Sequence, residues 1–124
     1  MSTDVIILVI DDDEAILEII TQSLTSNGFT ALSAKSGQDG LKIAAEKKPD
    51  AIILDWMMPE MNGNEVLKIL KNDNALKKIP VMMLTAKDEI NNISESLTMG
   101  AKEYIVKPFD LENMVLRLRN MITR

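Results

Sequence analysis

The sequence contains no cysteine and no histidine, and it has only 5 glycines and 4 prolines among 124 residues. Without cysteine, disulfides, thiolate metal sites and cysteine nucleophiles are excluded. Without histidine, the commonest metal ligand and general base is missing. Any metal held by this chain must therefore be a hard cation on oxygen ligands, such as Mg²⁺.

The composition is that of an ordinary globular protein, with 46% hydrophobic and 27% charged residues. A chain of this length fits one domain, residues 1–124, and is long enough to bury a core. The net charge of −5 argues against direct contact with nucleic acid. The first apolar run, Val5–Ile10, is too short to span a membrane and follows no basic region, so we expect a cytoplasmic protein without membrane contact.

Apolar runs alternate regularly with amphipathic segments. Five strands are predicted, at Val5–Ile10, Phe29–Ala34, Ala51–Leu54, Pro80–Leu84 and Glu103–Val106. Helices are predicted after each strand, at Ala15–Asn27, from a Ser36 cap to about Lys48, after an Asn62 cap, at Asp88–Met99, and from Leu111 to Ile122. Five such units predict an α/β, flavodoxin-like (βα)5 fold. This is a doubly wound three-layer sandwich with a five-stranded parallel sheet, for which the order 2-1-3-4-5 is known.

The segment Asp88–Met99 has the weakest apolar stripe of the five predicted helices. Only Ile90, Ile93 and Leu97 lie on that stripe, and Gly100 ends the helix. A lightly packed element is a good candidate to move, so this helix is expected to be less protected than the last one.

Polar residues stand just past four of the five predicted strands. They are Asp11 and Asp12, Asp55, Thr85, and Lys107. Because the carboxyl ends of parallel strands meet at one edge of a sheet, these side chains are expected to lie together. Crowded carboxylates resist ionising unless a cation intervenes, and Mg²⁺ would supply it. A carboxylate can form an aspartyl-phosphate, and Lys107 and Thr85 could stabilise its phosphoryl oxygens.

Each of these residues alone has an ordinary interpretation. Asp55 alone is typical of a solvated strand end, and the acids from Asp11 to Glu14 are typical of a helix amino terminus. Thr85 alone favours a helix cap, and Lys107 alone a surface charge. Their joint occurrence at four strand ends is what favours a phosphoryl-accepting site.

With these residues the chain resembles the receiver domains of two-component response regulators from Ile7 to Met121. Four blocks in order carry the resemblance: Leu8-Val9-Ile10-Asp11-Asp12-Asp13, Leu54-Asp55-Trp56-Met57-Met58-Pro59-Glu60-Met61-Asn62-Gly63, Leu84-Thr85-Ala86, and Gly100-Ala101 leading to Tyr104-Ile105-Val106-Lys107-Pro108-Phe109. The resemblance implies that Asp55 accepts a phosphoryl group from a histidine kinase or phosphotransfer protein.

The resemblance also implies a metal site. Asp12 and Asp55 would ligate Mg²⁺ together with the backbone carbonyl of Met57, and Asp11 would act directly or through water. Asp13 adds a third acid to the usual pair, so the assignment of ligands among residues 11 to 13 depends on register.

The remaining implied roles concern signalling. Lys107 would pair with the phosphoryl group, and its bond to Pro108 is expected to be cis. Thr85 and Tyr104 would form a switch pair that resets the surface of the fourth helix, fifth strand and fifth helix. A monomer or a phosphorylation-dependent dimer through this surface is expected.

The dimer mode common in transcription-factor receivers uses a charged network on that surface. Glu103 and Arg117 fit such a network, but Ile93, Met99 and Asn113 stand where charges are expected. These departures argue against that dimer mode, and they leave more apolar surface there than a free monomer needs.

Two other functions remain as alternatives. An aspartyl-phosphate phosphohydrolase commonly has a second acid two residues after the nucleophile, where this chain has Met57, which transfers no proton. A phosphorylation-independent binding module usually loses a key residue, and here all are present. We therefore expect a stoichiometric switch with slow autodephosphorylation rather than a turnover enzyme. The output, whether a domain beyond Arg124 or a separate effector, is open.

Overall fold

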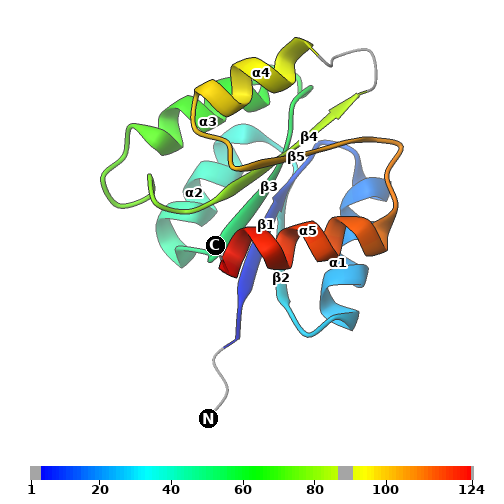
Figure 1. Ribbon diagram of the computed structural model, residues 1–124. Coiled ribbons are helices and arrows are strands. Elements are labelled where there is room, and N and C mark those ends of the chain that lie inside the picture. The colour runs from blue at the N-terminus through cyan, green and yellow to red at the C-terminus, as the bar shows by residue number, and fades with distance from the viewer. Residues whose placement is uncertain (1–3, 87–90, 124) are drawn as a thin grey trace.

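The computed structural model describes residues 4–86 and 91–123, which form a parallel sheet between two layers of helices (Figure 1). The strands are β1 (Ile6–Ile10), β2 (Thr30–Ala34), β3 (Ala51–Asp55), β4 (Val81–Ala86) and β5 (Glu103–Lys107). The helices are α1 (Glu14–Ser26), α2 (Gly37–Lys47), α3 (Gly63–Lys71), α4 (Asn91–Thr98) and α5 (Leu111–Thr123). The sheet order is β2-β1-β3-β4-β5 with all pairs parallel, so the predicted flavodoxin-like fold is confirmed.

Alternation along the strands divides the core into two clusters, one on each face of the sheet. Ile7 and Val9 of β1 pack with buried residues of α1 and α5, whereas Leu8 and Ile10 pack with those of α2 and α3. Successive strand residues point to opposite faces, which is why one strand feeds both clusters. β1, β3 and β4 are buried on both faces, so they read as uninterrupted apolar runs in the sequence.

The helix boundaries follow from local capping. Ser36 accepts a hydrogen bond from the Asp39 amide at the start of α2, and Asn62 forms a capping box with Glu65 at the start of α3. Gly28 and Gly100 have positive φ angles directly after the caps of α1 and α4. The predicted caps Ser36 and Asn62 and the predicted stop at Gly100 are thereby confirmed.

Three strands, β3, β4 and β5, extend further at their carboxyl ends than the sequence predicts, whereas β1 and β2 end where predicted. Asp55, Thr85 and Lys107 are the last or nearly the last residues of β3, β4 and β5, rather than the first residues beyond them. These side chains are therefore held by paired strands. Of the predicted helix Asp88–Met99, residues 88–90, including Ile90, lie outside the described residues.

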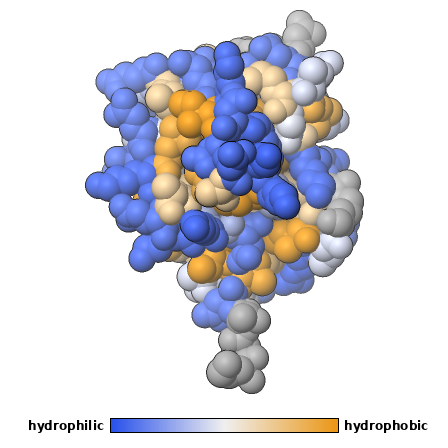
Figure 2. Space-filling model, turned by 90° about the vertical axis from the view of Figure 1, so that its left-hand side faces the viewer, coloured by the Kyte–Doolittle hydropathy of each residue, from blue (hydrophilic) through white to orange (hydrophobic). Residues whose placement is uncertain are grey.

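The surface seen from the side of α2 and α3 is mostly hydrophilic, with smaller hydrophobic areas between the polar side chains (Figure 2). Within the part of the chain that the structure describes, no helix is long and apolar enough to cross a membrane. The cytoplasmic location expected from the sequence stays a prediction.

Candidate functional site

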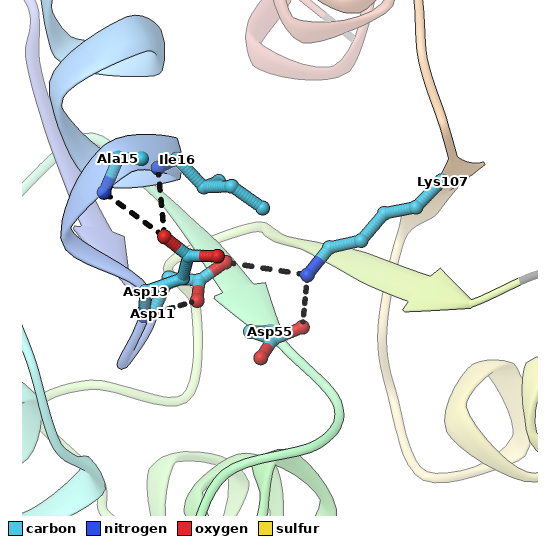
Figure 3. Close-up of polar contacts among 6 residues, drawn as sticks. All are labelled: Asp11, Asp13, Ala15, Ile16, Asp55 and Lys107. Carbon is cyan, nitrogen blue, oxygen red and sulfur yellow. Dashed lines mark hydrogen bonds and ion pairs between the residues drawn. The ribbon is translucent and has the colours of Figure 1, made fainter.

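Asp11, Asp55 and Lys107 meet at the carboxyl edge of the sheet. Lys107 extends from β5 and places its Nζ 2.9 Å from Oδ1 of Asp55 and 3.5 Å from Oδ2 of Asp11 (Figure 3). The parallel register brings them together, because Ile10 and Asp55 end adjacent strands and Lys107 ends the strand beyond β4. The peptide bond between Lys107 and Pro108 is cis, as the resemblance implied.

The three side chains also share one face of the sheet. Each lies two residues after a member of the cluster that packs against α1 and α5, and those members are Val9, Ile53 and Ile105. Since strand side chains alternate, Asp11, Asp55 and Lys107 continue that face. Asp11 is fully buried and Asp55 is 4% exposed, so both carboxylates are almost completely removed from solvent.

The geometry separates Asp13 from its acidic neighbours. Oδ1 of Asp13 accepts hydrogen bonds from the amides of Ala15, at 2.9 Å, and Ile16, at 3.3 Å, so Asp13 is the amino-terminal cap of α1 (Figure 3). The Asp13 amide in turn donates to Oδ1 of Asp11 at 2.9 Å and orients that carboxylate. Because Asp13 already caps α1, Asp11 and Asp12 are the candidate metal ligands among residues 11 to 13.

Burial and charge perturb the ionisation of all three groups. Burial raises the pKa of Asp55 to about 6, against the lowering effect of Lys107 and with a further contribution from the negative charge of Asp11. Burial likewise raises the pKa of Asp11, partly offset by the Asp13 amide and Lys107. Burial alone would lower the pKa of Lys107, but its bonds and charge interactions with Asp55 and Asp11 outweigh that effect and raise it.

The oxygen atoms of this site fit a hard divalent cation. One carboxylate oxygen from each of Asp11, Asp12 and Asp55 lies within 4.8 Å of the other two. Asp12 is exposed, whereas the other two are buried and hold their protons more tightly than free carboxylates. A single lysine does not balance three acids, and Mg²⁺ takes this kind of oxygen donor.

The raised pKa of Asp55 predicts an unusual dependence of stability on pH. Between the ordinary pKa of 3.8 and about 6, the folded chain binds this proton more tightly than the unfolded chain. Stability from this group is therefore lost as pH rises through that window. Without divalent cations, we expect Asp55→Asn to unfold in urea at pH 7.5 with a free energy about 2 to 3 kcal/mol above the wild type.

The same comparison at pH 4 provides the control. There the wild-type carboxyl is largely protonated in the folded chain, so the two chains should unfold at nearly the same urea concentration. Titrating groups that do not interact with Asp55 are common to both chains and cancel in the difference. A stability difference that did not change between pH 4 and pH 7.5 would contradict the raised pKa.

Thr85 and Tyr104 lie on the opposite face of the sheet from the three charged groups. Thr85, two residues after the buried Met83, is 2% exposed, and its Oγ1 donates to the Ala86 carbonyl at 3.4 Å. Tyr104 is half-buried against the cluster of α2 and α3. The predicted switch residues are therefore placed beneath the helices on that face, while their movement stays a prediction.

Arg117 of α5 contacts β5, the strand that carries Tyr104, at three points. Its Nη1 donates to the Tyr104 carbonyl at 2.9 Å and lies 3.4 Å from Oε1 of Glu103. Its guanidinium carbon also lies 5.9 Å from the centre of the Tyr104 ring. Glu103 and Arg117 thus pair within the chain, a contact that the sequence did not predict, and their role in a dimer stays untested.

The loop after Asp55 returns closely against the strand that carries it. A Cβ at Gly63 would lie 2.3 Å from the Asp55 carbonyl oxygen and 2.9 Å from Cα of Trp56, so no other residue fits without moving backbone. The Gly63 amide donates to the Trp56 carbonyl at 2.9 Å. The Met57 side chain is 56% exposed, and the predicted use of its carbonyl as a metal ligand stays a prediction.

Comparison with known proteins identifies relatives over nearly the whole chain. The sequence model of the response regulator receiver domain matches residues 7–119. The phosphate regulon transcriptional regulatory protein PhoB of Pseudomonas aeruginosa is 40% identical over 118 residues, which cover 95% of this chain and 52% of that protein. The probable transcriptional regulatory protein TcrX of Mycobacterium tuberculosis is 37% identical over 97% of this chain and 50% of that protein.

Solved structures agree with this similarity. The receiver domain of the Francisella response regulator 1452 superposes with a TM-score of 0.90 at 33% identity, covering 98% of each chain. The chemotaxis protein CheY4 of Vibrio cholerae superposes with a TM-score of 0.90 at 28% identity, covering 96% of this chain and 99% of that one. The chain spans about half the length of the curated relatives that it matches.

Proposed function

This chain belongs to the response regulator receiver domain family, and on that basis we propose that Asp55 is its phosphoacceptor. The observation that carries the proposal is the contact of Asp55 with Lys107 at 2.9 Å beside the buried Asp11. Asp55 lies at the end of a rigid central strand, whose backbone fixes the position of the carboxylate. The phosphoryl donor that we propose is a phosphohistidine of a histidine kinase or phosphotransfer protein.

In the proposed reaction, a carboxylate oxygen of Asp55 forms a bond to phosphorus while the bond between phosphorus and the histidine nitrogen breaks. The electron pair of that bond returns to the imidazole, which takes up a proton. The ammonium of Lys107 lies between Asp55 and Asp11 and can move its hydrogen bonds onto a phosphoryl oxygen. Thr85, whose strand lies between those of Asp55 and Lys107, would supply a further hydroxyl donor.

We propose that Asp11, Asp12, Asp55 and the Met57 carbonyl hold Mg²⁺. When bound, the cation would offset the charge of the acids and of the incoming phosphoryl group. Receiver domains generally bind Mg²⁺ at such an acidic pocket, and the cluster of carboxylate oxygens supports the same use here.

The reaction is proposed to occur once per signalling cycle, with slow hydrolysis afterwards. Met57 occupies the position where a phosphohydrolase would carry its second acid, and a thioether transfers no proton. Relatives that are named transcriptional regulatory proteins are about twice as long as this chain. We therefore propose that the phosphorylated domain acts on an output domain or separate effector through α4, β5 and α5.

The test is labelling of the wild-type chain by acetyl phosphate. Intact mass spectrometry should show the addition of one phosphoryl group when Mg²⁺ is present and none when it is removed by a chelator. Hydroxylamine, which cleaves acyl phosphates, should return the mass to that of the unlabelled chain. Labelling that persisted in hydroxylamine, or that needed no divalent cation, would contradict the proposal.

A further inference from the structure

Helix α4 contributes little apolar burial through its described side chains. From Ser94 to Thr98 the buried side chain is Ser96, at 2% exposure, while Leu97 is 43% exposed. A buried serine contributes far less hydrophobic stabilisation than a buried leucine. Over this part of α4, polar contacts therefore have more influence on where the helix lies.

Helix α3, in contrast, packs against the sheet through several buried apolar side chains and is hydrogen-bonded to the loop that follows Asp55. Val66, Leu67 and Leu70 are buried in the core, and the Gly63 amide is bonded to the Trp56 carbonyl. The capping box of Asn62 and Glu65 defines the first turn. A side chain in that first turn is thus held in a fixed position relative to the phosphoacceptor strand.

One such side chain connects the two helices. Nδ2 of Asn64, in the first turn of α3, donates to Oε1 of Glu95 on α4 at 2.8 Å. The acceptor is a carboxylate, and hydrogen bonds to charged groups are stronger than those between neutral groups. This bond therefore connects α4, whose described side chains bury little apolar surface, to the helix that is fixed beside Asp55.

The stabilisation from this hydrogen bond is partly offset by an unfavourable feature of the same Asn64 side chain. Oδ1 of Asn64 is buried and has no hydrogen-bond partner among the described residues. A buried acceptor without a partner is destabilising, and exposure to water would relieve it. The two helices also line a groove of about 590 Å³ with mainly polar side chains, so water can reach this region if α4 shifts.

We propose that the Asn64–Glu95 hydrogen bond is a latch that holds α4 in the arrangement of the unphosphorylated chain and opens when Asp55 is phosphorylated. This inference rests on the proposed function of Asp55. Thr85 and Tyr104 lie on the sheet face that α3 and α4 cover, so rearrangement of that pair acts on α4. The strength of the Asn64–Glu95 hydrogen bond determines how strongly α4 opposes the rearrangement of Thr85 and Tyr104.

Linkage makes the latch measurable. If the latch stabilises only the unphosphorylated arrangement, its removal must raise the affinity of Asp55 for a phosphoryl mimic. Beryllofluoride with Mg²⁺ is the probe, and the fluorescence of Trp56, the one tryptophan in the sequence and the neighbour of Asp55, is the signal. We expect Asn64→Ala and Glu95→Ala each to bind the mimic about threefold more tightly than the wild type.

Three further variants complete the experiment. The double variant Asn64→Ala/Glu95→Ala should bind no more tightly than either single variant, because both remove the same bond. Glu95→Gln keeps an acceptor oxygen but loses its charge, so its affinity for the mimic should lie between those of the wild type and Glu95→Ala. Lys68→Ala, on α3 in the same groove, should have no effect.

The possible outcomes separate the latch from the proposed function. If the wild type binds beryllofluoride and both single variants bind it no more tightly than the wild type, the proposed latch is wrong. The proposed phosphoacceptor role of Asp55 is then unaffected. Additive tightening in the double variant would also overturn the latch. A wild type that showed no Mg²⁺-dependent binding would overturn the proposed function, and the latch with it. General destabilisation cannot imitate the expected result, because it does not tighten binding.

Discussion

Asp55→Asn is expected to abolish labelling by acetyl phosphate in the presence of Mg²⁺. The amide that replaces the carboxylate is uncharged and a poor nucleophile, so no acyl phosphate forms at this position. The fold should survive, because the amide oxygen can still accept the hydrogen bond from Lys107. Intact mass spectrometry under the conditions that fully label the wild type measures the result.

Asp39→Asn is the matched control for this experiment. Asp39 is an exposed acid in the first turn of α2, so the same chemical change occurs away from the site, and full labelling is expected. Full stoichiometric labelling of Asp55→Asn would overturn the assignment of the phosphoacceptor. Asp55→Asn should be more stable than the wild type at neutral pH even though its labelling is lost. A buried phosphoacceptor carboxylate with a raised pKa explains both effects together.

Lys107→Ala should separate cation binding from the response to a phosphoryl group. Its ammonium is the only described basic group paired with Asp55 and Asp11, so its removal leaves the divalent cation as their counter-charge. Mg²⁺ affinity should therefore be kept or raised. Affinity for beryllofluoride should fall about tenfold or more, because a charge-assisted hydrogen bond to the phosphoryl mimic is lost.

Trp56 fluorescence can follow both titrations in the same samples. Lys102→Ala, at an exposed lysine just before β5, is the control and should bind both Mg²⁺ and beryllofluoride as the wild type does. Unchanged affinity of Lys107→Ala for beryllofluoride would show that the lysine does not contact the phosphoryl group. Loss of Mg²⁺ binding in this variant would show that Lys107 positions the carboxylates instead of only neutralising them.

The sequence was most informative where local chemistry dominates. Ser36 and Asn62 cap the helices that follow them because their side-chain oxygens accept backbone amides within three residues. The buried central strands were evident because strands covered on both faces must be apolar throughout. Asp55 and Thr85 were placed just past their strands instead of within them, because a polar side chain interrupts an apolar pattern without interrupting backbone pairing.

Other features depend on contacts between residues that are distant in the sequence. Arg117 lies against Tyr104 because α5 packs beside β5, and no spacing in the sequence indicates that approach. Asn64 and Glu95 meet because α3 and α4 cover the same face of the sheet. Leu97 was expected on the inward stripe of its helix and is 43% exposed, because the helix turns Ser96 inward.

By itself, the sequence predicted five βα units in a parallel sheet, the edge of the sheet where the site is expected, and the acids, lysine and threonine proposed for it. These follow from apolar periodicity and from the rule that parallel strands end at one edge. Only the tertiary structure decided that Asp13 caps α1 while Asp11 and Asp55 share Lys107. It alone also placed the charged groups on one face of the sheet and the switch pair on the other. The burial of Asp55 and the charges around it depend on every element packed against the site. They raise the pKa of Asp55, and no sequence pattern predicts this.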